Sequence, residues 1–593
     1  MSSPRPDARA AIDALQGHEA WALIRRSTRV GGKDTVGLVG GRRWVAESIM
    51  DVPLESGPPA PGRTCDRLVA VPFRQVSERG FEAHDDGTPL VVVDVEEERE
   101  YSVAEVLDAI PDGEVALADR GGFDIDDDDY AKVVEQIITD EIGQGEGANL
   151  VVGRRYRAVV ADWSAEKALT VFRRLLEREH GAYWTFCFFT GDRYLVGASP
   201  ERHVSVHGGE VRMNPISGTF RLPKQVAAPD GAPAADLKRD LLSFLADEKE
   251  IYELFMVVDE ELKMMCDICH EGGQVLGPFL KPMSHLYGAA LAILGRDPEG
   301  EPVLDSPIVI RTADVTPDGR LTVTAGATLV RDSDPAYEVA ETHAKAGGIL
   351  SAFGLVDAPA TRREELLGLV NDEDVLLALN GRNRRLSTFW LTDQADSEPD
   401  PVLAGRRVVI LDGEDDFVNM LCHVLGVLGL ESSVVRHEDY TEGCLDDADL
   451  VIVGPGPGDP RDDADPKMAT LRAAVERLLQ REQPFLAVCL GHQALCHTLG
   501  LPLAYKDIVF QGTQSALKVD GRTERVGFYN TFVGRVGDDT VLPEGVIVDA
   551  DAETGDVHVL RGPHYTGIQF HAESILTQRG DGLLHEIVAR LLG

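Results

Sequence analysis

The stretch PFLAVCLGHQAL, residues 484–495, joins a short apolar strand to the start of a helix. Cys489 stands at the junction, and Gly491 follows two residues later. The N–H groups at the start of a helix favour a thiolate and stabilise an oxyanion next to it. The stretch therefore predicts a catalytic cysteine at a sharp turn between strand and helix.

Strands and helices alternate around this turn. Residues 407–411 (RVVIL) and 450–453 (LVIV) are short β-branched runs, whereas residues 417–428 and 466–479 have helical periodicity. Such alternation predicts an α/β domain with a parallel sheet covered on both faces.

Two further motifs surround the same predicted site. GIQFHAES (567–574) places His571 and Glu573 two residues apart, so that in a strand they share a face. The imidazole could take the proton of Cys489 while the carboxylate orients the ring. GPGPGDP (454–460) follows a strand, and its glycines allow backbone N–H groups to converge on a developing negative charge.

These motifs, in this order, resemble those of class I glutamine amidotransferases over about residues 405–593. The resemblance implies that glutamine is hydrolysed through a glutamyl thioester. The residues it implies are the triad Cys489, His571 and Glu573, the oxyanion-hole donors Gly456 and Leu490, and the substrate contact Gln493. Ala487 and Ala572 replace a usual Gly and Pro, but both are small and carry no catalytic atoms, so we expect activity to survive.

A change of composition precedes this region. The stretch TDQADSEPDPVLAG (392–405) is polar, acidic and proline-containing. We expect an interdomain linker at 392–404, between a first domain at 1–391 and a second at 405–593. The first domain mixes clustered strand patterns with long helical patterns, including residues 235–269 and 336–353, which predicts an α+β fold with antiparallel sheets flanked by helices.

Two predicted helices of the first domain carry paired carboxylates. Glu250 and Glu253 share one helical face, as do Glu338 and Glu341. Such pairs suit a hard, oxygen-liking ion such as Mg²⁺. Taken alone, either pair is more typical of a solvated helix face.

The surrounding motifs favour a metal site over a solvated helix face. GASPERH (197–203), NPISGT (214–219), IRTADV (310–315) and AGATLVRDSDP (325–335) resemble, in order, the chorismate-utilising enzymes that include anthranilate, isochorismate and aminodeoxychorismate synthases. The resemblance implies that Glu250, Glu253, Glu338 and Glu341 surround Mg²⁺. The residues it implies for chorismate binding are Thr219, Arg311, Gly326, Ala327, Asn149 and Lys345.

Asn149 favours an aminated product. It stands where family members that activate water tend to have Lys, and it cannot serve as a base. Ammonia needs no base because it is already nucleophilic. Several strings, among them VPFRQVSERGFEAHDDGTPL (71–90), resemble the 2-amino-2-deoxyisochorismate synthases of phenazine pathways, which aminate chorismate at C2 and keep its pyruvyl group. Two alternatives stay open: an anthranilate synthase, which eliminates pyruvate, and a non-catalytic amidotransferase-like regulator.

The family pattern breaks after LKPM (280–283). Relatives continue with a histidine-containing helix and a Gly-rich loop before the Tyr-Gly strand, which here follows almost directly at 287–288. Either the chain lacks these residues or the sequence joins two separate segments, and we favour the second. His285 is the nearest histidine and a weak candidate for the general acid.

Composition limits the partners. The 593 residues carry 100 Asp+Glu against 58 Lys+Arg, a net charge of -42, so we expect no nucleic-acid or membrane partner. The start MSSPRPDARA lacks an apolar signal core, and we expect a cytoplasmic protein. The resemblance implies a homodimer that uses chorismate and L-glutamine and passes ammonia through its interior.

Overall fold

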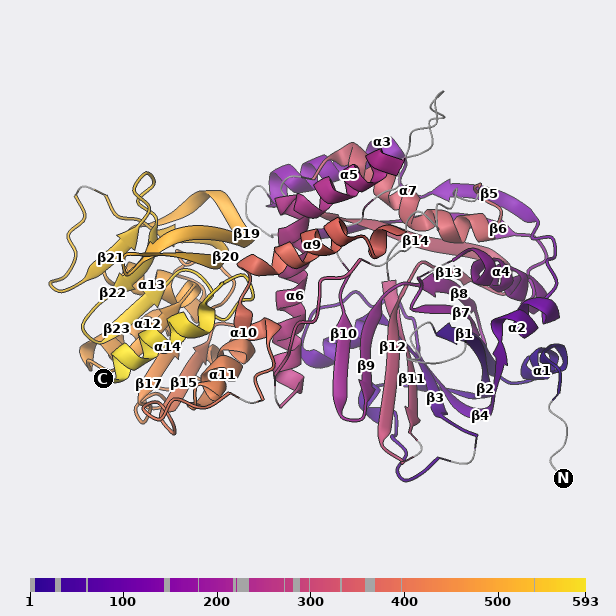
Figure 1. The fold of residues 1–593 in the computed structure, drawn as a ribbon, viewed down its shortest axis with the longest axis horizontal. Helices are drawn as coiled ribbons and strands as arrows, with labels where there is room; N and C mark the ends of the chain where they lie inside the picture. Colours follow the sequence, from indigo (N-terminus) through magenta and orange to yellow (C-terminus); the bar gives the residue numbers. More distant parts are fainter. Residues whose placement is uncertain are drawn as a thin grey trace. The chain divides into compact units, whose positions relative to one another are not determined.

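The computed structural model describes residues 6–26, 34–59, 62–142, 150–179, 181–216, 220, 234–270, 272–280, 288–297, 299–330, 333–357, 368–395, 397–537 and 539–593. The chain divides into two compact units (Figure 1). The first comprises Met1–Ile216 and Leu280–Val370, and the second comprises Ser217–Phe279 and Asn371–Gly593. Within the described ranges, no helix is both long and apolar enough to cross a membrane.

The described residues of the first unit form a 14-stranded sheet in the order β10-β9-β12-β11-β3-β4-β2-β1-β7-β8-β13-β14-β6-β5, with antiparallel neighbours throughout. Its strands are β1 (Ala20–Arg26), β2 (Thr35–Ala46), β3 (Cys65–Val71), β4 (Leu90–Ser102), β5 (Leu117–Phe123), β6 (Leu150–Val160), β7 (Trp184–Phe189), β8 (Tyr194–Ser199), β9 (Arg202–His207), β10 (Glu210–Asn214), β11 (Gly288–Arg296), β12 (Pro302–Ile310), β13 (Thr312–Val315) and β14 (Arg320–Leu329).

Helices cover this sheet. They are α1 (Ala8–Leu15), α2 (Val103–Ala109), α3 (Asp127–Gln136), α4 (Ala165–Arg178) and α7 (Pro335–Ala352). The helix α4 packs on β7 and β8, α7 packs on β14, and α3 packs on α7 (Figure 1). The sequence sets the start of α7, since Asp334 accepts a hydrogen bond from the N–H of Tyr337 and Pro335 occupies the first turn.

The described residues of the second unit form a seven-stranded sheet in the order β16-β15-β17-β18-β23-β22-β21, parallel from β16 to β23 and antiparallel beyond. Its strands are β15 (Arg407–Asp412), β16 (Glu431–Arg436), β17 (Leu450–Val453), β18 (Phe485–Val488), β21 (Ile547–Ala550), β22 (Val557–Arg561) and β23 (Tyr565–Ile568). A separate pair is formed by β19 (Leu503–Val519) and β20 (Arg522–Gly534). The helices are α5 (Ala234–Ala246), α6 (Glu248–Ile268), α9 (Glu373–Arg382), α10 (Thr388–Leu391), α11 (Phe417–Val427), α12 (Pro466–Gln480), α13 (Leu490–Thr498) and α14 (Gly580–Leu592).

The predicted fold classes are confirmed, with two local differences. The helix predicted at 235–269 is two helices, because Asp247 separates α5 from α6 at a position where aspartate favours a helix start. Within the motif IRTADV (310–315), Arg311 has a φ of 49°, so that β12 ends at Ile310 and β13 pairs with β8 and β14 instead.

The helices α5 and α6 belong to the second unit although they precede the predicted linker. The face of α6 that is buried includes Phe255 and Leu262, which join the same apolar core as Phe417 and Leu421 of α11. The predicted domain boundaries follow sequence motifs, and they stay a prediction.

A substitution at Phe186 of β7 tests the described core of the first unit, because this side chain is 0% exposed. We expect Phe186→Ala to lower the free energy of unfolding of this unit by about 3–5 kcal/mol, from lost burial and the cavity left behind. Chemical denaturation followed by circular dichroism measures the change. The matched control is Phe73→Ala, at a side chain that is 73% exposed, which should change stability by less than about 0.5 kcal/mol. Equal effects of the two substitutions would contradict the described core.

Candidate active sites

A sharp turn in the second unit presents Cys489. The residue follows β18 directly, caps α13, and has φ 51° and ψ −104°, a conformation that non-glycine residues rarely adopt. Gly491 makes the turn possible, because a Cβ at this position would lie 2.2 Å from the carbonyl oxygen of Val453. The strand, turn and helix predicted from the sequence are therefore present, and the thiol lies at the N-terminus of α13.

His571 and Glu573 form a buried hydrogen-bonded pair next to this turn. The Nδ1 atom of His571 lies 2.8 Å from Oε1 of Glu573, and both residues are 0% exposed. Burial by itself lowers the pKa of His571, but Glu573 and the side chain of Cys489 raise it well above its ordinary value. The imidazole is thus set up to hold a proton between the thiol and the carboxylate.

Aromatic and amide groups enclose the three residues. The ring of Phe417 lies 4.3 Å from the ring of His571, centroid to centroid. The Sγ atom of Cys489 lies 3.8 Å from the carbonyl oxygen of Tyr529 and 3.8 Å from Nε2 of Gln569. Gln569 was not predicted from the sequence, although it lies within the same motif as His571, and Tyr529 carries no local signal that could have predicted its role.

The predicted glutamine contact, Gln493, is buried on α13. Its Nε2 donates to the carbonyl oxygen of Phe532 at 2.7 Å and to Oε1 of Gln569 at 3.2 Å. It therefore supports Gln569, which in turn faces the thiol of Cys489. Its contact with substrate stays a prediction.

The two predicted oxyanion donors lie at the same edge of the sheet. Gly456 follows β17, and Leu490 is the first residue of α13 after the neighbouring strand β18. A Cβ on Gly456 would lie 2.1 Å from the carbonyl oxygen of Gly413, so this loop packs too closely for any other residue. The roles of both N–H groups stay predictions.

In the first unit, α7 and β14 bring several predicted residues together. Lys345 contacts Oε1 of Glu341 at 2.5 Å and donates to the carbonyl oxygen of Gly326 at 3.0 Å. Glu338 is 2% exposed and Lys345 is 4% exposed. Ala327 lies beside Gly326 in β14 and is buried. The helix thus places charged side chains against the strand that carries the predicted chorismate contacts.

Arg311 is a buried cation at the junction of β12 and β13. Its Nε atom has no hydrogen-bond partner within the described part of the chain. Burial lowers the pKa of Arg311 to about 9, against the opposing charges of Glu179 and Glu201. Burial also raises the pKa of Glu179 to about 7, against the charge of Arg311. An unsatisfied buried guanidinium suits an anionic ligand. Glu179, which the sequence analysis missed, is a second buried charge beside it.

The four predicted metal ligands belong to different units. Glu250 and Glu253 lie on α6 in the second unit, whereas Glu338 and Glu341 lie on α7 in the first. Their meeting at one metal ion stays a prediction. Asn149, Thr219 and His285 lie outside the described residues, so their predicted roles stay predictions too.

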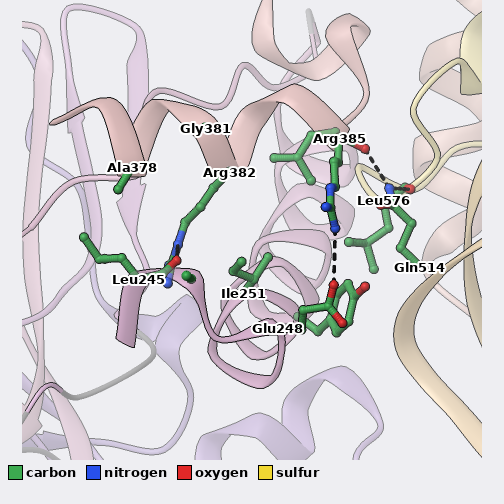
Figure 2. Close-up of a pocket in the computed structure, with 12 residues that line it drawn as sticks. Leu245, Glu248, Ile251, Ala378, Gly381, Arg382, Arg385, Gln514 and Leu576 are labelled. Atoms are coloured by element: carbon green, nitrogen blue, oxygen red, sulfur yellow. Dashed lines mark hydrogen bonds and ion pairs between the residues drawn. The ribbon is translucent and has the colours of Figure 1, made fainter. Parts of the chain in front are cut away.

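A cavity of about 280 Å³ lies within the second unit (Figure 2). Its walls come from the start of α6, from α9, and from Leu576, which follows the segment of His571 and Glu573. Arg385 contacts Glu248 at 3.3 Å, and Gln514 donates to the carbonyl oxygen of Arg385 at 2.6 Å. The cavity thus lies between the helix that carries Glu250 and the loop that follows the catalytic pair.

Two regions of the chain match known protein families. Residues 409–591 match the family described as glutamine amidotransferase class-I. Residues 94–281 and 280–351 match the family described as chorismate binding enzyme. The second match is in two pieces that meet at residues 280–281, close to the point where the sequence analysis finds the family pattern broken.

Relatives extend the similarity over nearly the whole chain. The protein named "Anthranilate synthase, phenazine specific" from Pseudomonas chlororaphis is 41% identical over 581 residues, covering 89% of this chain and 88% of that protein. Its namesake from Pseudomonas fluorescens is 39% identical over 628 residues, covering 97% and 95%. The anthranilate synthase of Azospirillum brasilense is 27% identical over 538 residues, covering 80% and 66%.

The 628-residue alignment is longer than this chain, so that relative carries residues with no counterpart here. The overall identity of the two phenazine-specific alignments is nevertheless 41% and 39%, and the longer one covers 97% of this chain. The chain therefore belongs to the family of the phenazine-specific anthranilate synthases and is a glutamine-dependent enzyme that aminates chorismate.

Proposed function

We propose that this enzyme forms 2-amino-2-deoxyisochorismate from chorismate and glutamine. The observation that carries the proposal is the buried group of Cys489, His571 and Glu573 in one chain with a chorismate-binding region. The identity to phenazine-specific relatives, 41% against 27% for the Azospirillum anthranilate synthase, supports the choice of product.

The geometry in the second unit supports a mechanism for glutamine hydrolysis. His571 takes the proton of Cys489, and the thiolate attacks the side-chain amide carbon of glutamine. The C–N bond breaks, ammonia leaves with the proton from His571, and a thioester remains. Water then attacks the thioester, glutamate leaves, and the thiol is restored. N–H groups of Gly456 and Leu490 hold the oxyanion in both steps.

Ammonia then travels through the protein interior to chorismate. The cavity of Figure 2 supports such a route, because it lies between the loop after Glu573 and the start of α6. Several of its walls are apolar side chains, among them Leu245, Ile251 and Leu576. A neutral molecule crosses such a space at a lower cost than an ammonium ion, which would lose its hydration.

The carboxylates of α6 and α7 fit Mg²⁺, because a hard divalent ion prefers oxygen ligands and both helices offer pairs of them. Glu250, Glu253, Glu338 and Glu341 would hold the ion, directly or through water. When bound, the ion supplies positive charge that lets a dianionic substrate approach these acidic helices. Arg311 adds a buried cation for a substrate carboxylate.

Amination forms a C–N bond at C2 of chorismate and breaks the C–O bond at C4. The nitrogen of ammonia bonds to C2 of chorismate, the ring double bonds shift, and the C4 hydroxyl leaves as water. The enolpyruvyl group stays attached in the proposed product. Its elimination would give anthranilate instead, and a chain without either activity would be a regulator.

Product identity tests this proposal. With chorismate, glutamine and Mg²⁺, we expect a product that retains the enolpyruvyl group, with no pyruvate released, measured by mass spectrometry and a coupled pyruvate assay. A chelator should abolish the reaction and added Mg²⁺ should restore it. Fluorescent anthranilate with one equivalent of pyruvate would establish the anthranilate synthase alternative instead.

Cys489→Ala separates the two half-reactions. We expect it to abolish glutamine-dependent amination but to leave the ammonium-dependent reaction intact, because the thiol acts only on glutamine. The matched control is Cys496→Ala, at a buried cysteine of the helix that Cys489 caps, which should keep both activities. Joint loss of both activities in Cys489→Ala would exclude two separable sites.

Glu573→Gln tests the pH dependence of glutamine hydrolysis. Since Glu573 helps to hold the pKa of His571 above its ordinary value, the amide should let that pKa fall. Protonated His571 then disappears at lower pH, so the alkaline limb of the kcat/KM profile for glutamine should move to lower pH. We also expect kcat to fall at least about 100-fold. An alkaline limb that stays in place would show that Glu573 does not act on His571 in this way.

A further inference from the structure

A buried carboxylate on α6 contacts the catalytic region of the amidotransferase. Asp259 is 0% exposed, yet it accepts three hydrogen bonds. The hydroxyl of Tyr529 donates to Oδ2 at 2.6 Å, the hydroxyl of Ser574 donates to the same oxygen at 2.5 Å, and the N–H of Ile575 donates to Oδ1 at 2.8 Å. All three donors come from the amidotransferase part of the sequence, far from α6 along the chain.

Each of these donors adjoins the triad. Ser574 and Ile575 follow Glu573 directly, so their hydrogen bonds set the path of the backbone that carries its carboxylate. The carbonyl oxygen of Tyr529 lies 3.8 Å from Sγ of Cys489, and its ring lies 5.4 Å from the ring of His571. One carboxylate therefore holds both sides of the catalytic group.

This arrangement is costly, which argues against a role in packing alone. Burial raises the pKa of Asp259 to about 6, although the hydrogen bonds from Ser574, Tyr529 and Ile575 oppose the rise. Burial and the charge of Asp259 also raise the pKa of Tyr529 well above its ordinary value, which keeps its hydroxyl a donor. An apolar side chain would fill this space at a lower cost in desolvation.

The fold around Asp259 does not depend on it alone. Trp390 of α10 donates through Nε1 to the carbonyl oxygen of Glu573 at 2.7 Å. The N–H of Ser387 donates to the carbonyl oxygen of Ile575 at 2.8 Å, and the hydroxyl of Thr577 donates to the carbonyl oxygen of His571. These bonds keep the backbone of the segment in place, so removal of the carboxylate should alter orientation more than folding.

A second residue of α6 contacts an aromatic ring that packs on His571. Lys263, one turn after Asp259, places Nζ 4.2 Å from the centroid of the Phe417 ring, and that ring packs on His571. Lys263 also contacts Asp415 at 3.6 Å, just before α11. The face of α6 that carries Asp259 and Lys263 is therefore fitted to the catalytic group at two points.

We propose that Asp259 is a positioning residue for glutamine hydrolysis, which orients Glu573 and the Tyr529 carbonyl around Cys489 and His571 through its bonds to Ser574, Ile575 and Tyr529. This inference rests on the proposed glutaminase function. It gives α6 a second role, because the same helix carries the predicted metal ligands Glu250 and Glu253.

The test compares glutamine hydrolysis with ammonium-dependent amination in the full-length enzyme. Glutamate release and chorismate consumption are measured for the wild type, Asp259→Asn, Ser574→Ala and the double variant. The matched control is Asp267→Asn, the same change at an exposed position of α6. We expect Asp259→Asn to lower kcat for glutamine hydrolysis about 10- to 100-fold, because small misplacements of catalytic groups have effects of this size.

The accompanying readouts separate positioning from general damage. KM for glutamine should stay within about threefold of the wild-type value, and ammonium-dependent amination should be unchanged. Ser574→Ala should lower kcat less, and the double variant should be no worse than Asp259→Asn, since both act through one contact. The control should behave as the wild type does.

Three results would overturn the proposal: a kcat of Asp259→Asn within about twofold of the wild type, an equal loss of ammonium-dependent amination, or additive effects in the double variant. If Asp259→Asn does not fold, an unchanged kcat in Ser574→Ala overturns it alone. A wild-type enzyme that releases no glutamate would instead refute the proposed function, and this inference with it.

Discussion

The close packing at the turn between β18 and α13 is the constraint on which the amidotransferase site depends. Cys489 is held at a φ of 51° because the helix begins directly against the end of β17. The carbonyl of Val453 at that end leaves no room for a Cβ at Gly491. The strain is confined to one residue and is supported by a parallel sheet that is buried on both faces. That turn fixes the thiol, and the other catalytic groups are then built around it by β23, α11 and α6.

Both units of the molecule contain buried charged side chains. His571 and Glu573 are enclosed together, Asp259 is enclosed beside them, and in the first unit Arg311 is enclosed near Glu179. Each of these groups loses hydration, and His571, Glu573 and Asp259 make short hydrogen bonds to neighbours in exchange. The guanidinium of Arg311 keeps an unsatisfied Nε among the described residues, which is where an anionic substrate would contribute most.

The helix α6 carries residues that are predicted to serve both half-reactions. Its sequence belongs to the chorismate-binding match, but its buried face packs in the amidotransferase core with α11. Glu253 and Asp259 are about 9 Å apart along the helix axis at 1.5 Å per residue. Glu250 and Asp259 lie on opposite faces, so one rigid element carries predicted metal ligands on one side and the anchor of the glutaminase triad on another.

The sequence by itself determined the elements that rest on local signals: the alternating strands and helices around Cys489, the antiparallel first region, and the pairing of His571 with Glu573 two residues away. These follow from periodicity and from the shared face of alternate strand residues, which need no distant partner. Only the tertiary structure decided that Tyr529 and Gln569 lie beside the thiol, that Asp259 binds Tyr529, Ser574 and Ile575 next to the triad, and that α6 joins the second unit. Those contacts connect residues far apart in the chain, and a buried aspartate in a helical pattern looks the same as a solvated one until the element that covers it is known.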